Sequence, residues 1–248
     1  MSKTAMIFGA TGAVGKQLLK DILKNGTYAK VISVGRRPVE IEDNTIPQDK
    51  LVQKTIDFNN LEAYRNDFKG VSDVFCCLGT TRADAGSAEN FIKIDQTYVL
   101  DSARLIAEEN KTDKALSPVH FLYCSASNSN KNSMFLYPKT KGETEAALEE
   151  IGFEKVSIFR PGFLETVEPR TRPRMSESIA FSIFKPINQL FNLNMVISVE
   201  TVGKAMHKVA ANASIKPTEE KNMKQSSIGS TIFSFSNADI EEIGHPNH

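Results

Sequence analysis

Three glycines near the amino terminus constrain the fold more than any other feature of the sequence. Gly9, Gly12 and Gly15 follow directly after the apolar run at residues 5–8. A helical pattern of apolar residues begins at once, at Leu18, Leu19, Ile22 and Leu23. A strand, a glycine turn and a helix in this order form the unit that cradles a dinucleotide, because glycine allows the tight turn and a close approach of the backbone to the pyrophosphate. The amino end of the helix then faces the anion.

We expect the dinucleotide to contact this turn at Gly9, Thr11, Gly12, Ala13, Val14 and Gly15. The alternative is a glycine-rich turn that binds nothing. The order of strand, turn and helix favours binding, because the mechanism requires that order.

Strand-like and helix-like segments alternate through most of the chain. Strands are expected at 31–34, 51–56, 74–77, 119–124 and 156–159, and helices from the glycine turn to 25, at 90–109 and at 134–151. The helix at 90–109 has an apolar stripe formed by Phe91, Ile94, Tyr98, Leu105 and Ile106. This alternation predicts an α/β fold, a doubly wound Rossmann-type parallel sheet with helices on both faces.

The 248 residues are expected to form a single domain, residues 1–248, with a small substrate-side extension near the carboxyl terminus. Residues 161–198 combine a loop rich in proline and arginine with an apolar helix-like stretch at 176–191, a pattern that suits a lid over the substrate. A helix at 199–211 follows. Residues 214–230 are polar without an apolar period and are expected to be mobile. A strand at 231–235 and a short helix near Asp239 complete the chain.

Composition excludes several classes of function. Thirty basic and thirty acidic residues leave no net charge, which argues against a nucleic-acid surface or a polybasic membrane patch. Cys76, Cys77 and Cys124 lack metal-ligand spacing and are typical of reduced thiols in an intracellular protein. No apolar run approaches the ~20 residues of a membrane span, and the first strand leaves no room for a targeting peptide. We therefore expect a cytoplasmic monomer or weak dimer without a metal.

Residues after the second, third and fourth strands point to the coenzyme. Arg36 and Arg37 stand where a carboxylate would select NAD, and guanidinium groups instead favour the 2′-phosphate of NADP(H). Two solvated arginines are the alternative. Asp57 is placed to read the adenine edge, or equally to cap the helix that follows. Leu78 and Gly79 belong to a loop expected to run beside the coenzyme.

Three residues near the fifth strand suggest the chemistry. Tyr137 and Lys141 are four apart, so on one helix the ammonium would lie near the phenol and make it a better proton donor. Ser125 ends the fifth strand and could hold a carbonyl oxygen, with Ser127 as a weaker rival. Pro138 requires Tyr137 to lie at or near the start of the helix. A tyrosine and a lysine at this spacing also occur by chance, but all three residues share the sheet edge of the glycine turn.

These motifs together resemble the short-chain dehydrogenase/reductase superfamily over nearly the whole chain. More narrowly, the sequence resembles the atypical branch that contains the Tat-interacting oxidoreductase and its fungal mitochondrial relatives. The strings that carry this resemblance are Gly35-Arg36-Arg37, Cys76-Cys77-Leu78-Gly79-Thr80-Thr81-Arg82, Phe135-Leu136-Tyr137 and Phe159-Arg160-Pro161-Gly162.

The resemblance implies NADPH bound along the glycine turn, the two arginines and the loop at 78–79, with Tyr137 and Lys141 also beside it. It further implies contacts from Leu164 and from Arg172, because Arg172-Pro173 has the family's spacing. One departure from the broader superfamily is a missing asparagine in the middle helix, where Asp95-Gln96 stands instead. Turnover could therefore be slow.

The resulting hypothesis is an NADPH-dependent reductase of an aldehyde, ketone or quinone. The alternative is a non-catalytic, NADPH-responsive regulatory module that binds a protein partner, which the family resemblance also supports. The same resemblance raises peripheral association with the mitochondrial outer membrane as an alternative to a purely cytoplasmic location. Arg170, Arg172 and Arg174 could select an anionic substrate or could simply be solvated. We expect no serine-hydrolase triad around His120, which we interpret as a packed or surface residue.

Overall fold

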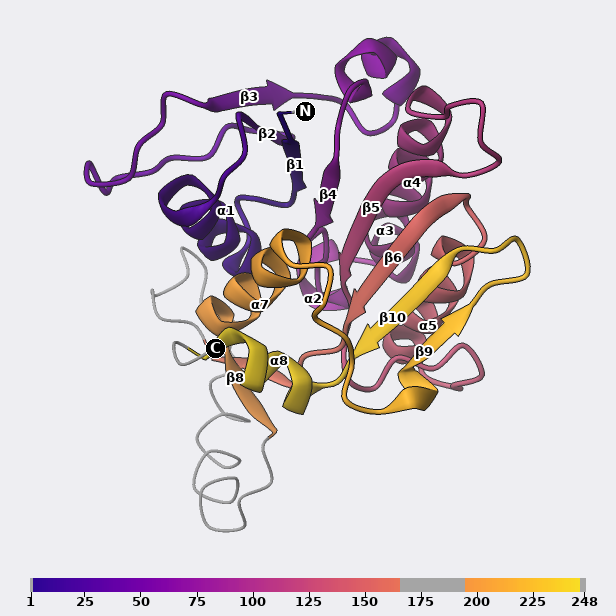
Figure 1. The fold of residues 1–248 in the computed structure, drawn as a ribbon. Helices are drawn as coiled ribbons and strands as arrows, with labels where there is room; N and C mark the ends of the chain where they lie inside the picture. Colours follow the sequence, from indigo (N-terminus) through magenta and orange to yellow (C-terminus); the bar gives the residue numbers. More distant parts are fainter. Residues whose placement is uncertain (1, 166–194, 246–248) are drawn as a thin grey trace.

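The protein is built around one eight-stranded sheet, described here from a computed structural model for residues 2–165 and 195–245 (Figure 1). The strand order is β3-β2-β1-β4-β5-β6-β10-β9. In that order the strands are Leu51–Thr55, Lys30–Gly35, Thr4–Phe8, Asp73–Cys76, Ser117–Cys124, Phe153–Phe159, Thr231–Phe235 and Met223–Gln225. Every pairing is parallel except that of β10 with β9. The predicted doubly wound sheet is confirmed, with an antiparallel edge strand that the sequence pattern did not reveal.

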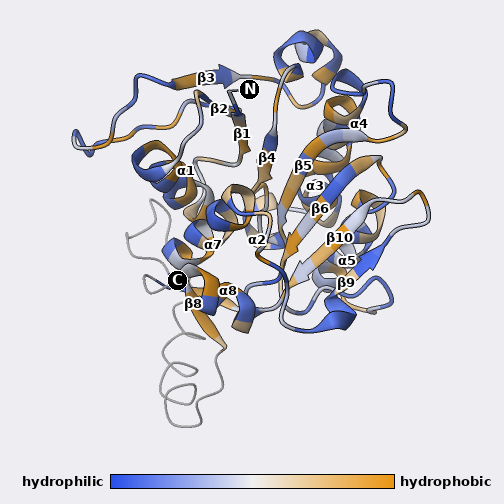
Figure 2. Ribbon diagram, viewed as in Figure 1, coloured by the Kyte–Doolittle hydropathy of each residue, from blue (hydrophilic) through white to orange (hydrophobic). Residues whose placement is uncertain are grey.

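Helices cover both faces of the sheet. One face carries α1 (Ala13–Asn25), α7 (Val199–Ala211) and α8 (Asn237–Gly244), and the other carries the 3-10 helix η1 (Leu61–Phe68), α4 (Tyr98–Glu109) and α5 (Leu136–Leu148). Side chains of β1 alternate between the two cores, so that Ile7 packs on the first face and Phe8 on the second. Helices α1, α4 and α7 carry hydrophilic and hydrophobic residues side by side in Figure 2, as expected for helices with one buried side.

The direction in which successive strands are added to the sheet reverses between β1 and β4. From β1 the strands continue outward to β2 and β3, and after β3 the chain returns to place β4 on the other side of β1. In doubly wound folds, ligands bind outside the carboxyl ends of the strands at this switch point. The glycine turn after β1 and the loop after β4 meet there.

The predicted helix at 90–109 is interrupted. It consists of α3 (Ala88–Ile92), a π-helical turn η2 (Lys93–Thr97) and α4, with the short α2 (Arg82–Ala85) before them. A π turn accommodates an extra residue and rotates the buried face. Ile94 and Tyr98 of the predicted stripe are consequently only half-buried, while Asp95 and Val99 are fully buried.

The region after β6 contains a second, two-stranded sheet that was not predicted. Its strands, β7 (Phe163–Glu165) and β8 (Val196–Ser198), are parallel, and Leu164 lies opposite Ile197. Arg172 and the expected helix at 176–191 lie outside the described residues. The polar segment 214–230 contains the 3-10 turn η3 (Glu220–Asn222) and the edge strand β9. None of the helices in the described ranges has the length and hydropathy of a membrane span.

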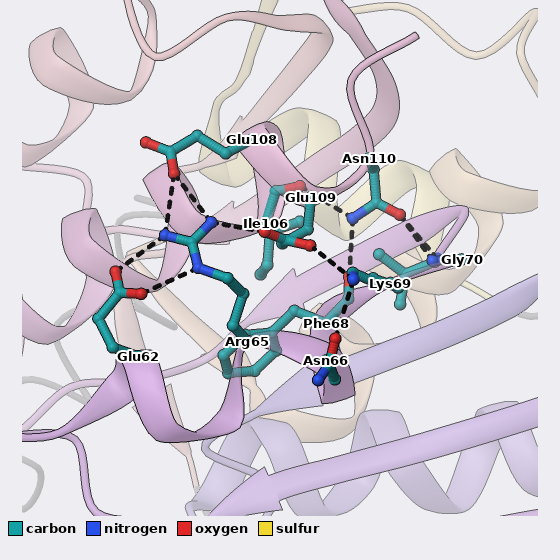
Figure 3. A network of polar contacts seen from close by, with 11 residues as sticks. Glu62, Arg65, Asn66, Phe68, Lys69, Gly70, Ile106, Glu108, Glu109 and Asn110 are labelled. Carbon is teal, nitrogen blue, oxygen red and sulfur yellow. Dashed lines mark hydrogen bonds and ion pairs between the residues drawn. The ribbon is translucent and has the colours of Figure 1, made fainter.

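A polar network joins η1 to the end of α4 (Figure 3). Arg65 forms ion pairs with Glu108 and Glu109, and the Asn110 side chain donates a 2.7 Å hydrogen bond to the Phe68 carbonyl. Because exposed ion pairs contribute little individually, this network fixes the position of the helix end more than it stabilises the fold. Together with packing along α4, it anchors the helix that continues from the buried π turn.

Candidate active site

The glycine turn has the shape that a dinucleotide requires. Gly9 has φ +77°, and a Cβ added there would lie 2.5 Å from the Cys77 carbonyl oxygen. A Cβ at Gly15 would overlap the carbonyl of Gly9, so the start of α1 packs directly on the turn. Gly12 caps α1 without a side-chain acceptor, and no acidic residue stands in the first helical turn. The helix N-terminus can therefore receive an anion such as a pyrophosphate.

The residues expected to read the adenosine half lie at the ends of β2 and β3. Arg36 and Arg37 follow β2 and are exposed. Asp57 is exposed and accepts hydrogen bonds from the Asn59 backbone N–H and side chain, at 2.9 and 2.8 Å. These hydrogen bonds lower the pKa of the Asp57 carboxyl. The carboxylate thus supports a local turn ahead of η1, which begins only at Leu61, and an adenine contact stays a prediction.

Lys141 is the centre of a buried polar cluster. Its ammonium nitrogen lies 2.9 Å from Asp95 Oδ1 and donates a 3.2 Å hydrogen bond to the Tyr123 hydroxyl. The other carboxylate oxygen, Asp95 Oδ2, accepts a 2.8 Å hydrogen bond from the Thr80 backbone N–H. A Cβ at Gly79 would lie 3.5 Å from the ammonium. The loop after β4 and the middle of α5 are therefore held together by one carboxylate.

The environment decides the protonation of this cluster. Burial acts to lower the pKa of Lys141, but its neighbours Tyr123, Asp95 and Tyr137 outweigh burial and raise that pKa well above its usual range. Burial raises the pKa of the Tyr123 phenol, and the neighbouring lysine only partly opposes this. Near neutral pH, the site therefore contains a charged Lys141 and an un-ionised Tyr123.

Tyr137 lies at the second position of α5, after the N-cap residue Phe135. Pro138 occupies the first turn, as expected, so its missing N–H costs the helix nothing. The Tyr137 ring lies 5.7 Å from the Phe91 ring and is 41% exposed. Lys141 follows one turn later on the same side of the helix. An accessible phenol thus stands next to a buried cation.

Ser125 continues directly from β5. Its backbone N–H donates to the Phe159 carbonyl at 2.7 Å, and its hydroxyl lies 2.9 Å from the Ser129 hydroxyl. The Ser125 side chain is buried. Ser127 is exposed, and its backbone N–H donates a hydrogen bond to the Pro161 carbonyl. Of the two candidate serines, Ser125 is the one built into the end of the strand.

Sequence reasoning missed two partners of Lys141, the Asp95 carboxylate and the Tyr123 hydroxyl. Spacing could not reveal them because the contacts come from three separate segments of the chain. One signal was available. Asp95 stands four residues after Phe91, so a helical pattern puts its charge on the apolar stripe, where an unpaired carboxylate would be costly.

His120 is a packed residue, one of the two interpretations that its sequence position allowed. His120 Nε2 lies 2.8 Å from the Ser157 hydroxyl, and Nδ1 lies 3.5 Å from Asp73 Oδ1. The serine, histidine and aspartate of a hydrolase triad contact one another in the same order. The three residues lie on adjacent strands, which their distance along the chain conceals. Ser157 is completely buried, so no substrate can reach its hydroxyl. The cluster is therefore structural.

Within residues 2–165 and 195–245, no group of three metal-ligating side chains is present, and all three cysteines are free.

A family model described as NAD(P)H-binding matches residues 9–213. The chain belongs to the NAD(P)H-binding family. Among its relatives, rat Protein HTATIP2 is 38% identical over 205 residues, which cover 83% of this chain and 80% of the relative. Protein FMP52-2, mitochondrial, from Scheffersomyces stipitis is 32% identical, with 88% of this chain and 89% of the relative covered. The resemblance drawn from the sequence motifs is thereby confirmed.

Solved structures support the fold. A short-chain dehydrogenase/reductase from Saccharomyces cerevisiae superposes with a TM-score of 0.62 at 14% identity, covering 98% of this chain and 99% of that one. UDP-glucose 4-epimerase from Thermotoga maritima gives a TM-score of 0.59 at 13% identity, covering 83% of this chain and 72% of that one. At such identities the likeness establishes a Rossmann-type architecture and leaves the substrate open.

Proposed function

We propose that this family member is an NADPH-dependent oxidoreductase that reduces the carbonyl group of an aldehyde, ketone or quinone. The observation that carries the proposal is the buried, charged Lys141 one helical turn from the accessible phenol of Tyr137. Such a pair is an arrangement for proton donation, since the cation stabilises the phenolate that forms. Ser125 comes from the neighbouring strand end at the same edge of the sheet.

The coenzyme half of the proposal depends on the turn after β1 and on the arginines after β2. The glycine cradle and the uncapped start of α1 fit a pyrophosphate, and Arg36 and Arg37 fit a 2′-phosphate. Leu78, Gly79 and the Lys141 ammonium would complete the site, with Leu164 and Arg172 as further contacts. When bound there, NADPH supplies the hydride.

The protein's own groups handle the charge that develops on the substrate oxygen. As the oxygen gains electrons, the Tyr137 hydroxyl gives it a proton, and Lys141 stabilises the resulting phenolate. Ser129 donates its single O–H to the Ala126 carbonyl at 2.7 Å, so the Ser125 hydroxyl donates to Ser129. Ser125 would have to turn its O–H toward a bound carbonyl, where a hydrogen bond strengthens as negative charge grows.

A substrate screen tests this function. The purified protein is mixed with NADPH and a panel of aldehydes, ketones and quinones, and coenzyme oxidation is followed together with formation of the alcohol or hydroquinone. For an aldehyde or ketone hit, coenzyme deuterated on the transferred position should deliver deuterium to the product carbon. Absence of turnover on every panel member would contradict the reductase and would favour the non-catalytic, NADPH-responsive regulator.

The cellular location is a separate part of the proposal. Fungal relatives carry the word mitochondrial in their names. We infer a cytoplasmic protein, with peripheral association at the mitochondrial outer membrane as the alternative that these relatives suggest. Fractionation of cells that express the chain, with and without a carbonate wash of the mitochondria, separates the two locations.

A further inference from the structure

Asp95 is a fully buried carboxylate that the proposed chemistry does not use directly. It lies at the centre of the π turn η2, and its side chain has no exposed surface. One oxygen lies 2.9 Å from the Lys141 ammonium, and the other accepts the Thr80 N–H at 2.8 Å. The residue therefore connects the π turn, α5 and the loop after β4.

We propose that Asp95 is a positioning residue that keeps the Lys141 side chain charged and fixed one helical turn from Tyr137, and that holds the loop after β4 at the same point. The inference rests on the proposed reductase for its catalytic consequence. The statement about the charge of Lys141 concerns the folded protein itself and can be tested without turnover.

The other titratable groups around Lys141 cannot replace Asp95. They are the phenols of Tyr123 and Tyr137 and the three thiols, Cys76, Cys77 and Cys124. Burial raises the pKa of Cys76 to about 12 and that of Cys124 to about 11, and it raises the pKa values of Cys77 and Tyr123 as well. Of the groups that face Lys141 in the described chain, Asp95 is thus the carboxylate that balances its charge near neutral pH.

Geometry also explains why the ammonium is held in one place. The Lys141 ammonium donates a hydrogen bond to the Tyr123 hydroxyl and forms an ion pair with Asp95 Oδ1, so two groups from different elements fix its position. Without the carboxylate, a buried lysine tends to lose its proton, because burial disfavours the charged form. Tyr137 would then lose the cation that makes it a proton donor.

The test compares Asp95→Asn with Asp101→Asn. The first change keeps the size of the side chain and an oxygen that can accept the Thr80 N–H. The second removes the same charge from the half-exposed partner of Arg104 on α4 and serves as the matched control. Lysine labelled with carbon-13 at Cε reports protonation by NMR in the coenzyme-free protein, with the Lys141 signal assigned by its absence from Lys141→Met.

In the unmodified protein, the Lys141 signal should stay that of an ammonium throughout the pH range in which an ordinary lysine is charged, because the neighbours of Lys141 raise its pKa. In Asp95→Asn its titration should move down by at least about one pH unit, because a charge a few ångströms away in a poorly hydrated site is worth that much. Asp101→Asn should leave it unchanged, and Asp95→Glu should restore much of the shift. A Lys141 that is already neutral near pH 8 in the unmodified protein would overturn the inference without any variant. So would equal titration in Asp95→Asn and Asp101→Asn.

A kinetic readout follows if the screen finds a substrate. The alkaline limb of the pH profile of kcat/KM should move to lower pH in Asp95→Asn and stay in place in Asp101→Asn. A lysine shift without any turnover would disprove the reductase but leave the role of Asp95 intact. Turnover without a lysine shift would support the reductase and disprove the role of Asp95.

Discussion

Arg36 and Arg37 are the residues on which the proposed preference for NADPH depends. Each ends in a guanidinium group exposed at the carboxyl end of β2, where a 2′-phosphate would lie. Replacing both with alanine should weaken NADPH binding roughly tenfold or more, because charge-assisted hydrogen bonds to phosphate are lost, and should leave NADH binding nearly unchanged. Calorimetric titration of both coenzymes measures this. Arg104→Ala, on α4, is the control, and equal losses for NADPH and NADH would contradict the assignment.

Single residues of the site were predictable to the extent that their neighbours in sequence define them. Ser125, Tyr137 and Lys141 could be proposed because a strand end and an i, i+4 spacing place them. The Asp95 ion pair and the Tyr123 hydrogen bond could not, since they depend on how η2, β5 and α5 pack. The position of Asp95 on an apolar stripe indicates that its charge is buried, but it does not identify the partner from another element.

At the scale of elements, the turn between β1 and α1 tolerates no side chain at its first glycine. Gly9 and Gly70 both have positive φ, but a Cβ at Gly9 would strike the Cys77 carbonyl, whereas a Cβ at Gly70 would meet nothing within 4 Å. Gly70→Ala should therefore cost about 1–2 kcal/mol of unfolding free energy, and Gly9→Ala roughly 2–5 kcal/mol with loss of NADPH binding. Urea unfolding and calorimetry of both variants check this. Equal destabilisation would show that the backbone contact at Gly9 is unimportant.

Elements with a strong period were predicted well, and short ones were not. The central strands and the helices α1 and α7 follow from apolar spacing, whereas α5 buries mostly polar residues. The strands β7, β8 and β9 are three residues long, too short to show a period. The π turn could not be predicted from the sequence for another reason. Its extra residue leaves the composition of the helix unchanged and only shifts which side chains are buried.

At the scale of the whole molecule, stability should depend on a polar cluster buried in the sheet. Burial lowers the pKa of His120 despite Asp73 beside it. Burial alone would raise the pKa of the Asp73 carboxyl, but hydrogen bonds and charges from His120, Lys3 and Tyr28 outweigh it and lower that pKa. Both groups therefore take up protons more readily when the chain is unfolded. By linkage, the stabilisation is present above the unfolded pKa and is lost as pH falls.

The free energy of unfolding should accordingly fall as pH drops from about 7.5 to 5, through the unfolded histidine pKa, and fall further below about pH 4. Urea midpoints measured across this range test the trend. His120→Gln retains polar contacts without titrating and should flatten the part between about pH 7.5 and 5. His245→Gln, at the exposed end of α8, should not. If the free energy of unfolding of His120→Gln still falls between about pH 7.5 and 5, groups other than His120 cause this pH dependence.

The central claim is that the Tyr137 hydroxyl gives the substrate its proton, and one kinetic comparison tests it most directly. With a carbonyl substrate from the screen, NADPH oxidation is measured for the unmodified protein, for Tyr137→Phe and for the control Tyr64→Phe on η1. Loss of a general acid should lower kcat by a factor of roughly 100 or more in Tyr137→Phe, with NADPH affinity retained. Tyr64→Phe should retain full activity. A Tyr137→Phe enzyme that turns over within about twofold of the unmodified protein would contradict the account.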